Sequence, residues 1–463
     1  MKIRSILISI IFLITVLACN NKNTVGEIKI DEVVKNLDNP KYVFVDNRDD
    51  SFYNGFKEKD AKRGGHIKGA VQFNCAIFDY IEEDKFESYV GAKGITKDKT
   101  VVFYGTERET LNCISGEFAA RGYKTKIFDG FKEYANNEEY PMEFFTNFQF
   151  SVSPEWINEV IQGQKPETYN NDKFMIFEVS WGPLDKAETY KSGHIPGAYH
   201  FNTDWVENDP VWNFSEPSVV EKNLLAAGIT SDKTIILYSD DHSAAYRVFL
   251  ALKWMGVKDV RVMNGNLSTW TDKGLTTENK INEPTAETSF GVATIPANPQ
   301  YIIEMPEEAM KMQKEGLKLV SNRAWEEYTG EVSGYDYIPG KGEPLGAIWG
   351  FSGVDASNMS DYLDPDGTLR NPEEMFGLWK SQNMSKGDKL AFYCGTGWRA
   401  SIPWFMTQMD GWSDTYVYDG GWNAWQMDAK NPVQTGAPNN MTKPDSRNNY
   451  GKIEKKANAT CRG

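Results

Sequence analysis

Histidine and cysteine are both scarce in this chain, which has four histidines and five cysteines in 463 residues. No histidine follows His242, so chemistry in the last third of the chain must proceed without an imidazole base. The cysteines form no close pair and no cluster with histidine at the spacing of a metal site. We therefore expect neither a disulfide framework, nor a metal site, nor a cofactor.

Positive charge is also in deficit, because 50 lysines and arginines face 65 acidic residues and give a net charge of -15. A chain of this balance lacks the basic surface that binds phosphate backbones, so we expect no nucleic acid partner. The length exceeds what one ordinary hydrophobic core accommodates and suggests three domains.

The amino terminus is typical of a signal peptide. Lys2 and Arg4 precede an apolar run over residues 6–17, which is short for a membrane-spanning helix of about 20 residues. The run ends in Val16-Leu17-Ala18-Cys19, which resembles the lipobox of bacterial lipoproteins. This resemblance implies a lipoprotein signal over residues 1–19, a lipid on Cys19 and a membrane-anchored protein in the cell envelope, on the periplasmic or extracytoplasmic side. Leu17 is bulkier than usual at its position, so an uncleaved anchor or a plain secretory signal stays open.

One plan of residues occurs three times along the chain. Each copy has an apolar strand with a polar end, a glycine turn, a second apolar strand, a loop, a helix, and a strand that closes on a glycine corner. The loops and corners are Gly105 with Gly130, Ser239 with Gly265, and Cys394 with Gly420. Short apolar strands that alternate with helices predict parallel sheets flanked by helices, an α/β fold. We expect domains at 27–143, 152–283 and 297–434, and a mobile polar tail at 435–463.

Three motifs together resemble rhodanese domains: the turn Gly193-His194-Ile195-Pro196-Gly197-Ala198, the strand-cysteine-loop-helix unit at Cys394, and the corner Asp419-Gly420-Gly421-Trp422. The likeness extends to bacterial tandem sulfurtransferases that carry three rhodanese-like domains and keep activity in the last. It implies three such domains here and transfer of a sulfane sulfur through a cysteine persulfide to a thiol or cyanide.

The third loop, Cys394-Gly395-Thr396-Gly397-Trp398-Arg399, suits this chemistry. A thiol attacks only after it loses its proton, and Cys394 should lie between a strand and a helix that begins near Ala400. Backbone N–H groups and the helix dipole can then converge on the sulfur. We predict that Cys394 is the nucleophile and that the rest of the loop binds the donor: Gly395, Thr396, Gly397, Trp398 and Arg399. Glycines allow the curl, Thr396 adds a hydroxyl, and the Arg399 guanidinium can hold an anion such as thiosulfate.

The first two loops lack the nucleophile, since Gly105 and Ser239 stand where the third copy has Cys394. We expect both domains to be inactive structural partners. A serine hydrolase at Ser239 is disfavoured because no nucleophile-elbow motif surrounds it. A phosphatase is disfavoured too, because related phosphatases resemble Cys-x5-Arg, whereas four residues separate Cys394 from Arg399 and the shorter loop fits a sulfur-sized group.

The third copy carries Glu343-Pro344 where the others have His-Ile, after an insert over residues 330–342 that holds Tyr335, Tyr337 and Lys341. In the three-domain likeness this insert approaches the active loop, so Lys341 and Arg323 are further candidates for donor binding. The Cys-Gly-Thr-Gly sequence resembles mercaptopyruvate enzymes, whereas the terminal arginine resembles thiosulfate users. We favour thiosulfate as the donor, with 3-mercaptopyruvate open. A non-catalytic sulfur carrier or binding scaffold is the alternative class of function.

Overall fold

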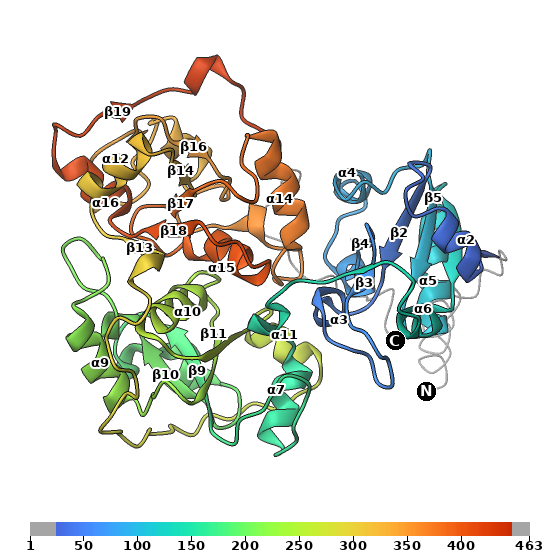
Figure 1. Cartoon of the computed structure of the whole chain (residues 1–463), viewed down its shortest axis with the longest axis horizontal. Coiled ribbons are helices and arrows are strands. Elements are labelled where there is room, and N and C mark those ends of the chain that lie inside the picture. Colours follow the sequence, from blue (N-terminus) through green and yellow to red (C-terminus); the bar gives the residue numbers. More distant parts are fainter. Residues whose placement is uncertain (1–24, 447–463) are drawn as a thin grey trace, which may run out of the picture. The chain divides into compact units, whose positions relative to one another are not determined.

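The computed structural model describes residues 25–446 and divides them into two compact units, one ending at Phe148 and the other beginning at Gln149 (Figure 1). The first unit has one five-stranded sheet in the order β1-β6-β5-β2-β4, and all its neighbouring strands are parallel. Its strands are β1 Gly26–Glu27, β2 Tyr42–Asp46, β4 Val71–Gln72, β5 Thr100–Tyr104 and β6 Lys124–Phe128. Its helices are α2 Ile30–Lys35, α3 Asp50–Asn54, α4 Phe86–Ala92, α5 Arg108–Ala120 and α6 Phe131–Asn136, and β3 His66–Ile67 pairs with β7 Met142–Glu143.

The second unit contains the other two repeats. The second repeat has the parallel sheet β10-β9-β11-β12-β8, with β8 Ser151–Val152, β9 Phe174–Ser180, β10 Tyr199–Asn202, β11 Thr234–Tyr238 and β12 Asp259–Met263. Its helices are α7 Pro154–Ile161, α8 Glu188–Ser192, α9 Pro217–Ala226, α10 Ala244–Met255 and α11 Leu267–Asp272.

The third repeat has the parallel sheet β13-β18-β17-β14-β16, with β13 Ile302–Ile303, β14 Lys318–Ser321, β16 Ile348–Trp349, β17 Leu390–Tyr393 and β18 Thr415–Tyr418. Its helices are α12 Pro306–Lys314, α13 Trp325–Tyr328, α14 Pro372–Ser381, α15 Ser401–Met409 and α16 Gly421–Met427, and β15 Glu343–Pro344 pairs with β19 Val433–Gln434. The three sheets share one strand order, which confirms the predicted fold class of three α/β repeats.

Local chemistry sets several of these boundaries. Helix α7 begins after Ser153, whose hydroxyl accepts a hydrogen bond from the Trp156 N–H at 3.2 Å, and Pro154 occupies its first position. Helix α15 begins directly after Ala400, as predicted, and Pro403 lies in its first turn, where a missing N–H costs nothing. Strand β11 is buried over its whole length, which explains its continuous apolar sequence.

Helices α10 and α15 follow the loops of the second and third repeats and pack side by side in the second unit (Figure 1). Aromatic rings fill their contact: the centroid of the Phe405 ring lies 4.8 Å from that of Tyr246 and 4.8 Å from that of Phe249. Such pairs add to burial energy and fix orientation. The second repeat is thereby held against the loop that precedes α15.

The start of the predicted polar tail is packed against the third repeat. The Gly436 N–H donates to the Thr329 carbonyl at 2.7 Å, and the Arg370 guanidinium donates to the Ser446 carbonyl at 2.9 Å. These hydrogen bonds attach residues 436 and 446 to the third repeat, and the rest of the predicted tail lies outside the described residues.

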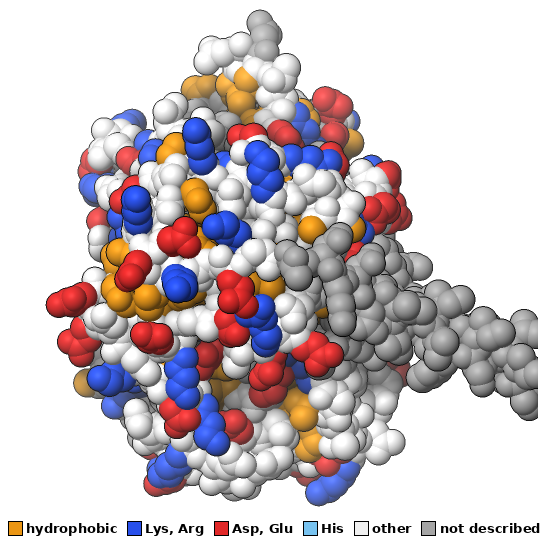
Figure 2. Space-filling view, turned by 90° about the vertical axis from the view of Figure 1, so that its right-hand side faces the viewer, with side chains coloured by type: hydrophobic (Ala, Val, Ile, Leu, Met, Phe, Trp, Pro, Cys, Tyr) orange, Lys and Arg blue, Asp and Glu red, His pale blue; other side chains and the backbone are white. Residues whose placement is uncertain are grey.

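Acidic and basic side chains are interspersed on the face shown in Figure 2, and neither sign forms a continuous field there. Within residues 25–446 no helix has the length and apolar content needed to cross a membrane. The predicted signal segment and Cys19 lie outside these residues.

Candidate active site

Cys394 is the first residue after β17 and is fully buried, between that strand and α15. The glycine corner clamps this end of the loop: the Trp422 N–H donates to the Cys394 carbonyl at 2.8 Å, and the Asn423 N–H donates to the Gly395 carbonyl at 3.0 Å. Gly421 has φ +54°, and a Cβ there would lie 2.8 Å from the Cys394 oxygen. Only glycine therefore allows the corner to approach the cysteine so closely.

The second half of the loop needs glycine as well. Gly397 has φ +91°, and a Cβ there would lie 2.6 Å from a guanidinium nitrogen of Arg247, a residue of α10 in the second repeat. Ser401 holds the loop from the helix side, since its hydroxyl donates to the Gly397 carbonyl at 3.0 Å and its N–H to the Trp398 carbonyl at 3.1 Å. At the other predicted loop glycine, Gly395, an added Cβ would collide with the Tyr335 ring, so both predicted glycines have a structural reason.

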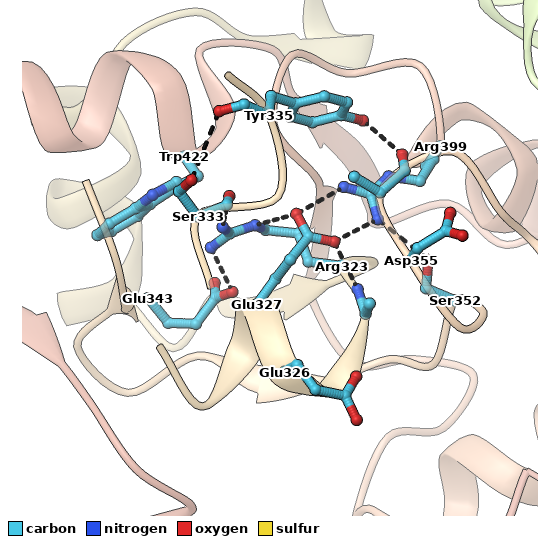
Figure 3. Close-up of polar contacts among 12 residues, drawn as sticks. Arg323, Glu326, Glu327, Ser333, Tyr335, Glu343, Ser352, Asp355, Arg399 and Trp422 are labelled. Carbon is cyan, nitrogen blue, oxygen red and sulfur yellow. Dashed lines mark hydrogen bonds and ion pairs between the residues drawn. The ribbon is translucent and has the colours of Figure 1, made fainter. Parts of the chain in front are cut away.

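Arg399 lies beside the cysteine loop but is not a free cation. It is buried, and its two terminal nitrogens donate to the carboxylate of Glu327 at 2.8 and 3.1 Å (Figure 3). Its Nε has no hydrogen-bond partner among residues 25–446. Tyr335, Glu327 and Cys394 outweigh burial and raise the pKa of Arg399. The predicted anion-binding guanidinium can therefore offer its Nε–H to a donor, and Glu327 offsets part of its charge.

Glu327 is the centre of a buried chain of charges, as Figure 3 shows. It also accepts from Arg323 at 3.2 Å, and Arg323 pairs with Glu343 at 2.7 Å. Burial opposes ionisation of Glu327, but the Arg399 and Arg323 guanidinium groups lower its pKa below the usual value. Burial dominates at Glu343 and raises its pKa to about 7 despite the neighbouring Arg323.

The two further candidates for donor binding, Arg323 and Lys341, differ in burial and in hydrogen-bond partners. Arg323 is fully buried and donates to the carbonyls of Gly342 at 2.7 Å and Ser333 at 2.8 Å in addition to its two carboxylates. A donor would have to displace one of these acceptors, so the structure gives no support to its role in binding. Lys341 is exposed, and its Nζ donates to the Glu331 carbonyl at 2.9 Å.

The tyrosines of the insert lie at the loop. Tyr335 and Tyr337 stack with ring centroids 5.3 Å apart, the Arg399 guanidinium lies 5.4 Å from the Tyr335 ring centroid, and Tyr337 hydrogen-bonds the Thr396 side chain. Burial raises the pKa of both phenols, and the nearby Cys394 raises it further. Tyr337 is 54% exposed, so it forms an accessible aromatic surface next to the nucleophile. Nothing in the sequence around these tyrosines indicates this position.

The second repeat contributes further residues that sequence reasoning missed. The Trp398 indole donates to Glu207 at 2.6 Å, so this predicted donor-binding side chain is fastened to the neighbouring repeat. Arg247 is completely buried and pairs with both Glu207 and Asp419. Their sequence separation from Cys394 left no local signal for these contacts.

The loops of the other repeats are filled by their own side chains. The Ser239 hydroxyl, at the position of the nucleophile, donates to the Asp241 carbonyl and accepts from the Ala245 N–H at 3.2 Å. In the first repeat the Thr106 hydroxyl donates to Glu58. The Ser239 hydroxyl donates to a backbone carbonyl, which is too weak a base to activate it. That the first two domains are inactive stays a prediction.

Comparison with known families matches the model of the rhodanese-like domain to residues 29–136, 164–273 and 305–428. The thiosulfate sulfurtransferase YnjE of Escherichia coli K12 is 34% identical over 395 residues, which cover 85% of this chain and 88% of YnjE. The sulfur carrier protein TtuD of Thermus thermophilus is 30% identical over 295 residues, 62% of this chain and 96% of TtuD.

Solved structures of similar fold include the anaerobic ergothioneine biosynthesis enzyme of Chlorobium limicola in complex with its natural substrate trimethyl histidine, at 34% identity and a TM-score of 0.84 over 89% of this chain and 100% of that one. A structure of EanB with ergothioneine covalently linked to a persulfide cysteine matches with a TM-score of 0.84 and 34% identity over 89% and 99% of the two chains.

Proposed function

The chain belongs to the rhodanese family of sulfurtransferases, with three copies of the domain, and from this we propose that Cys394 carries the transferred sulfur as a persulfide. The Cys394 thiolate attacks the outer sulfur of the donor, and the sulfur–sulfur bond of thiosulfate breaks with its electron pair leaving on sulfite. An acceptor thiolate or cyanide then attacks the outer persulfide sulfur, and Cys394 leaves again as a thiolate. Each half-reaction regenerates the reactant of the other, a ping-pong cycle.

The observation that carries this proposal is the placement of Cys394 between β17 and α15, in a loop whose backbone is fixed at both ends. Among the three equivalent loops, this one alone presents a sulfur nucleophile. The buried cation Arg399 lies within electrostatic reach of that sulfur.

Thiosulfate is the donor that we propose, with 3-mercaptopyruvate as the alternative. The resemblance of the chain to YnjE supports thiosulfate. Within the site, the unpaired Arg399 Nε can donate to an anionic oxygen, while the Glu327 carboxylate keeps the remaining guanidinium nitrogens occupied. The donor therefore gains one directed contact and a reduced positive field.

A second candidate acceptor is suggested by the tyrosine pair. Aromatic faces attract quaternary ammonium groups, and Tyr337 exposes half of its surface beside Cys394. EanB structures contain hercynine and ergothioneine. Transfer of the persulfide sulfur to the imidazole of a trimethyl histidine is thus a candidate reaction for this chain as well. The non-catalytic alternative is a sulfur carrier, and the resemblance of the chain to TtuD supports it.

A purified chain beginning after residue 19 tests these proposals directly. Thiosulfate and 3-mercaptopyruvate are each supplied with cyanide, with a dithiol or with trimethyl histidine, and the sulfur-containing products are quantified. Turnover with thiosulfate and cyanide or thiol supports the sulfurtransferase, and formation of ergothioneine supports the second candidate. A persulfide on Cys394 without turnover would identify a carrier, and no persulfide with either donor would refute the proposal.

We also propose that Cys19 anchors the protein to a membrane in the cell envelope, on the periplasmic or extracytoplasmic side, through several acyl chains. Fractionation of host cells that express the full chain and the Cys19→Ala variant tests this. Membrane association that the substitution abolishes supports the anchor, and a soluble unmodified chain refutes it.

A further inference from the structure

The second repeat reaches into the active loop through Glu207. This residue follows the short turn Thr203–Trp205 and bridges to Phe214, and its side chain is 1% exposed. One carboxylate oxygen accepts from the Trp398 indole at 2.6 Å, and the other accepts from Arg247 Nε at 2.9 Å. A buried carboxylate with two charge-assisted or polar donors is strongly held, so it fixes the indole that ends the loop.

Arg247 forms the second connection. Arg247 lies near the start of α10. Its guanidinium donates to the Asp419 carboxylate at 2.5 Å and to the Trp212 carbonyl at 3.2 Å, and it lies 3.9 Å from the Phe214 ring centroid. The Phe214 N–H binds the other oxygen of Asp419 at 2.7 Å. Asp419 opens the glycine corner, and that corner binds the Cys394 carbonyl through the Trp422 N–H.

The two connections hold opposite ends of one loop. Glu207 fixes Trp398 near its end, and Arg247 fixes the corner that binds Cys394 at its start. The second repeat contains no cysteine, so neither residue can position a sulfur nucleophile within its own repeat. We propose that Glu207 and Arg247, two residues of the second repeat, are positioning residues for Cys394 in the third.

The same contact makes the loop sensitive to charge. Burial, together with a smaller effect of Asp419, raises the pKa of Glu207 to about 7. Arg247 and Trp398 oppose this rise. Tyr337 also faces this carboxylate, which contributes to the raised pKa of the phenol. Below pH 7 the group of Glu207, Arg247 and Asp419 is neutral, and above pH 7 it carries one negative charge beside the site of an anionic donor. The Michaelis constant for thiosulfate should therefore rise as the pH passes 7.

This inference rests on the proposed sulfur transfer at Cys394, so its test needs a readout besides turnover. Hydrogen–deuterium exchange of the peptide over residues 394–399 reports directly how firmly the loop is held. We expect faster exchange in Glu207→Ala and Trp398→Phe, and a smaller increase in Glu207→Gln, whose amide oxygen still accepts from the indole while its NH2 group faces the Arg247 Nε–H. Asp259→Asn, at a second ion pair of the same repeat with Arg261, is the matched control and should leave the loop unchanged.

Kinetics supply the second readout. Glu207→Ala and Trp398→Phe should each lower kcat/KM by roughly ten- to a hundredfold, because a loosened loop misplaces the nucleophile, and the double variant should lose no more than either single variant. Glu207→Gln should retain kcat and abolish the rise of KM above pH 7. Unchanged loop exchange in Glu207→Ala, or fully additive losses in the double variant, would overturn the positioning role. A wild-type chain that forms no persulfide would instead refute the proposed function, while exchange would still decide whether Glu207 holds the loop.

Discussion

The carboxylate of Glu327 binds both terminal nitrogens of Arg399, at 2.8 and 3.1 Å, where both side chains are almost completely buried. Glu327 comes from α13 and Arg399 from the end of the loop, so this pair ties the insert side of the third repeat to the nucleophile. Because Glu327 also accepts from Arg323, one carboxylate balances two buried guanidinium groups. Glu327 therefore reduces the positive field at the donor site without cancelling it.

Glu327→Gln should free positive charge at the expense of stability. The substitution keeps the shape but leaves two buried cations with less compensation, and loss of one partner of a buried pair costs about 3 to 5 kcal/mol. We expect a lower free energy of unfolding in urea and, in the folded fraction, a lower Michaelis constant for thiosulfate. Glu326→Gln on the same helix is the control and should change neither. An unchanged Michaelis constant would show that Glu327 does not moderate the donor site.

Arg399→Ala should raise the Michaelis constant for thiosulfate more than it lowers kcat, since it removes a cation that holds the donor in ground and transition states alike. A lost hydrogen bond to a charged group is worth about 1.5 to 3 kcal/mol, so we expect a fall of roughly ten- to a hundredfold in kcat/KM. If saturating donor fails to restore the rate and the pH profile moves upward, Arg399 instead stabilises the Cys394 thiolate.

Cys394→Ser should abolish sulfur transfer and leave the fold intact, because the exchange removes only the sulfur nucleophile. Cys75→Ser and Cys113→Ser are matched controls and should retain turnover. Mass spectrometry after treatment with thiosulfate should place one added sulfur on the peptide that contains Cys394. A persulfide found on another cysteine would contradict the assignment.

The elements that repeat in sequence could be predicted well. Apolar strands at 100–104, 234–238 and 389–393 appear as β5, β11 and β17 within one residue, because their hydrophobic runs and the following loops are local signals. Helix α15 begins where the loop sequence indicated. Repetition makes these strands easier to predict, because the same order of strand, loop and helix occurs in all three copies.

The electrostatic partners could not be predicted, because they depend on contacts between distant parts of the chain. Arg399 has the right place for a donor-binding cation, but Glu327 lies 72 positions earlier and Glu207 reaches Trp398 across 191 positions. Glu343 visibly departs from the repeat in the sequence, but only the structure shows that it pairs with Arg323. In the first repeat Arg48 pairs with Asp46, whereas the third repeat has Ser321 there and Arg323 pairs with Glu343 instead.

Glu343 should make the stability of the third repeat depend on pH in a direction opposite to that of most carboxylates. Burial raises its pKa from 4.5 to about 7, so between these values the folded chain retains a proton that the unfolded chain has lost. The free energy of unfolding must then fall as the pH rises from about 4.5 to about 7, by an amount on the order of 3 kcal/mol from this group. Below pH 4.5 Glu343 is protonated in both the folded and the unfolded chain, so its stabilising contribution relative to higher pH is fully present.

Glu343→Gln removes this titration, so its stability relative to the wild type should increase from about pH 4.5 to about pH 7 and level off above pH 7. Urea unfolding of both proteins at pH 5, 6, 7 and 8 measures the difference. Glu278→Gln is the control, because the Gly197 N–H lowers the pKa of Glu278 below its ordinary 4.5, so the stabilising effect of Glu278 stays constant from pH 5 to pH 8 and is lost only at lower pH. Parallel stability curves for wild type and Glu343→Gln would show that Arg323 keeps Glu343 ionised throughout, and that the buried chain of charges stays fully ionised.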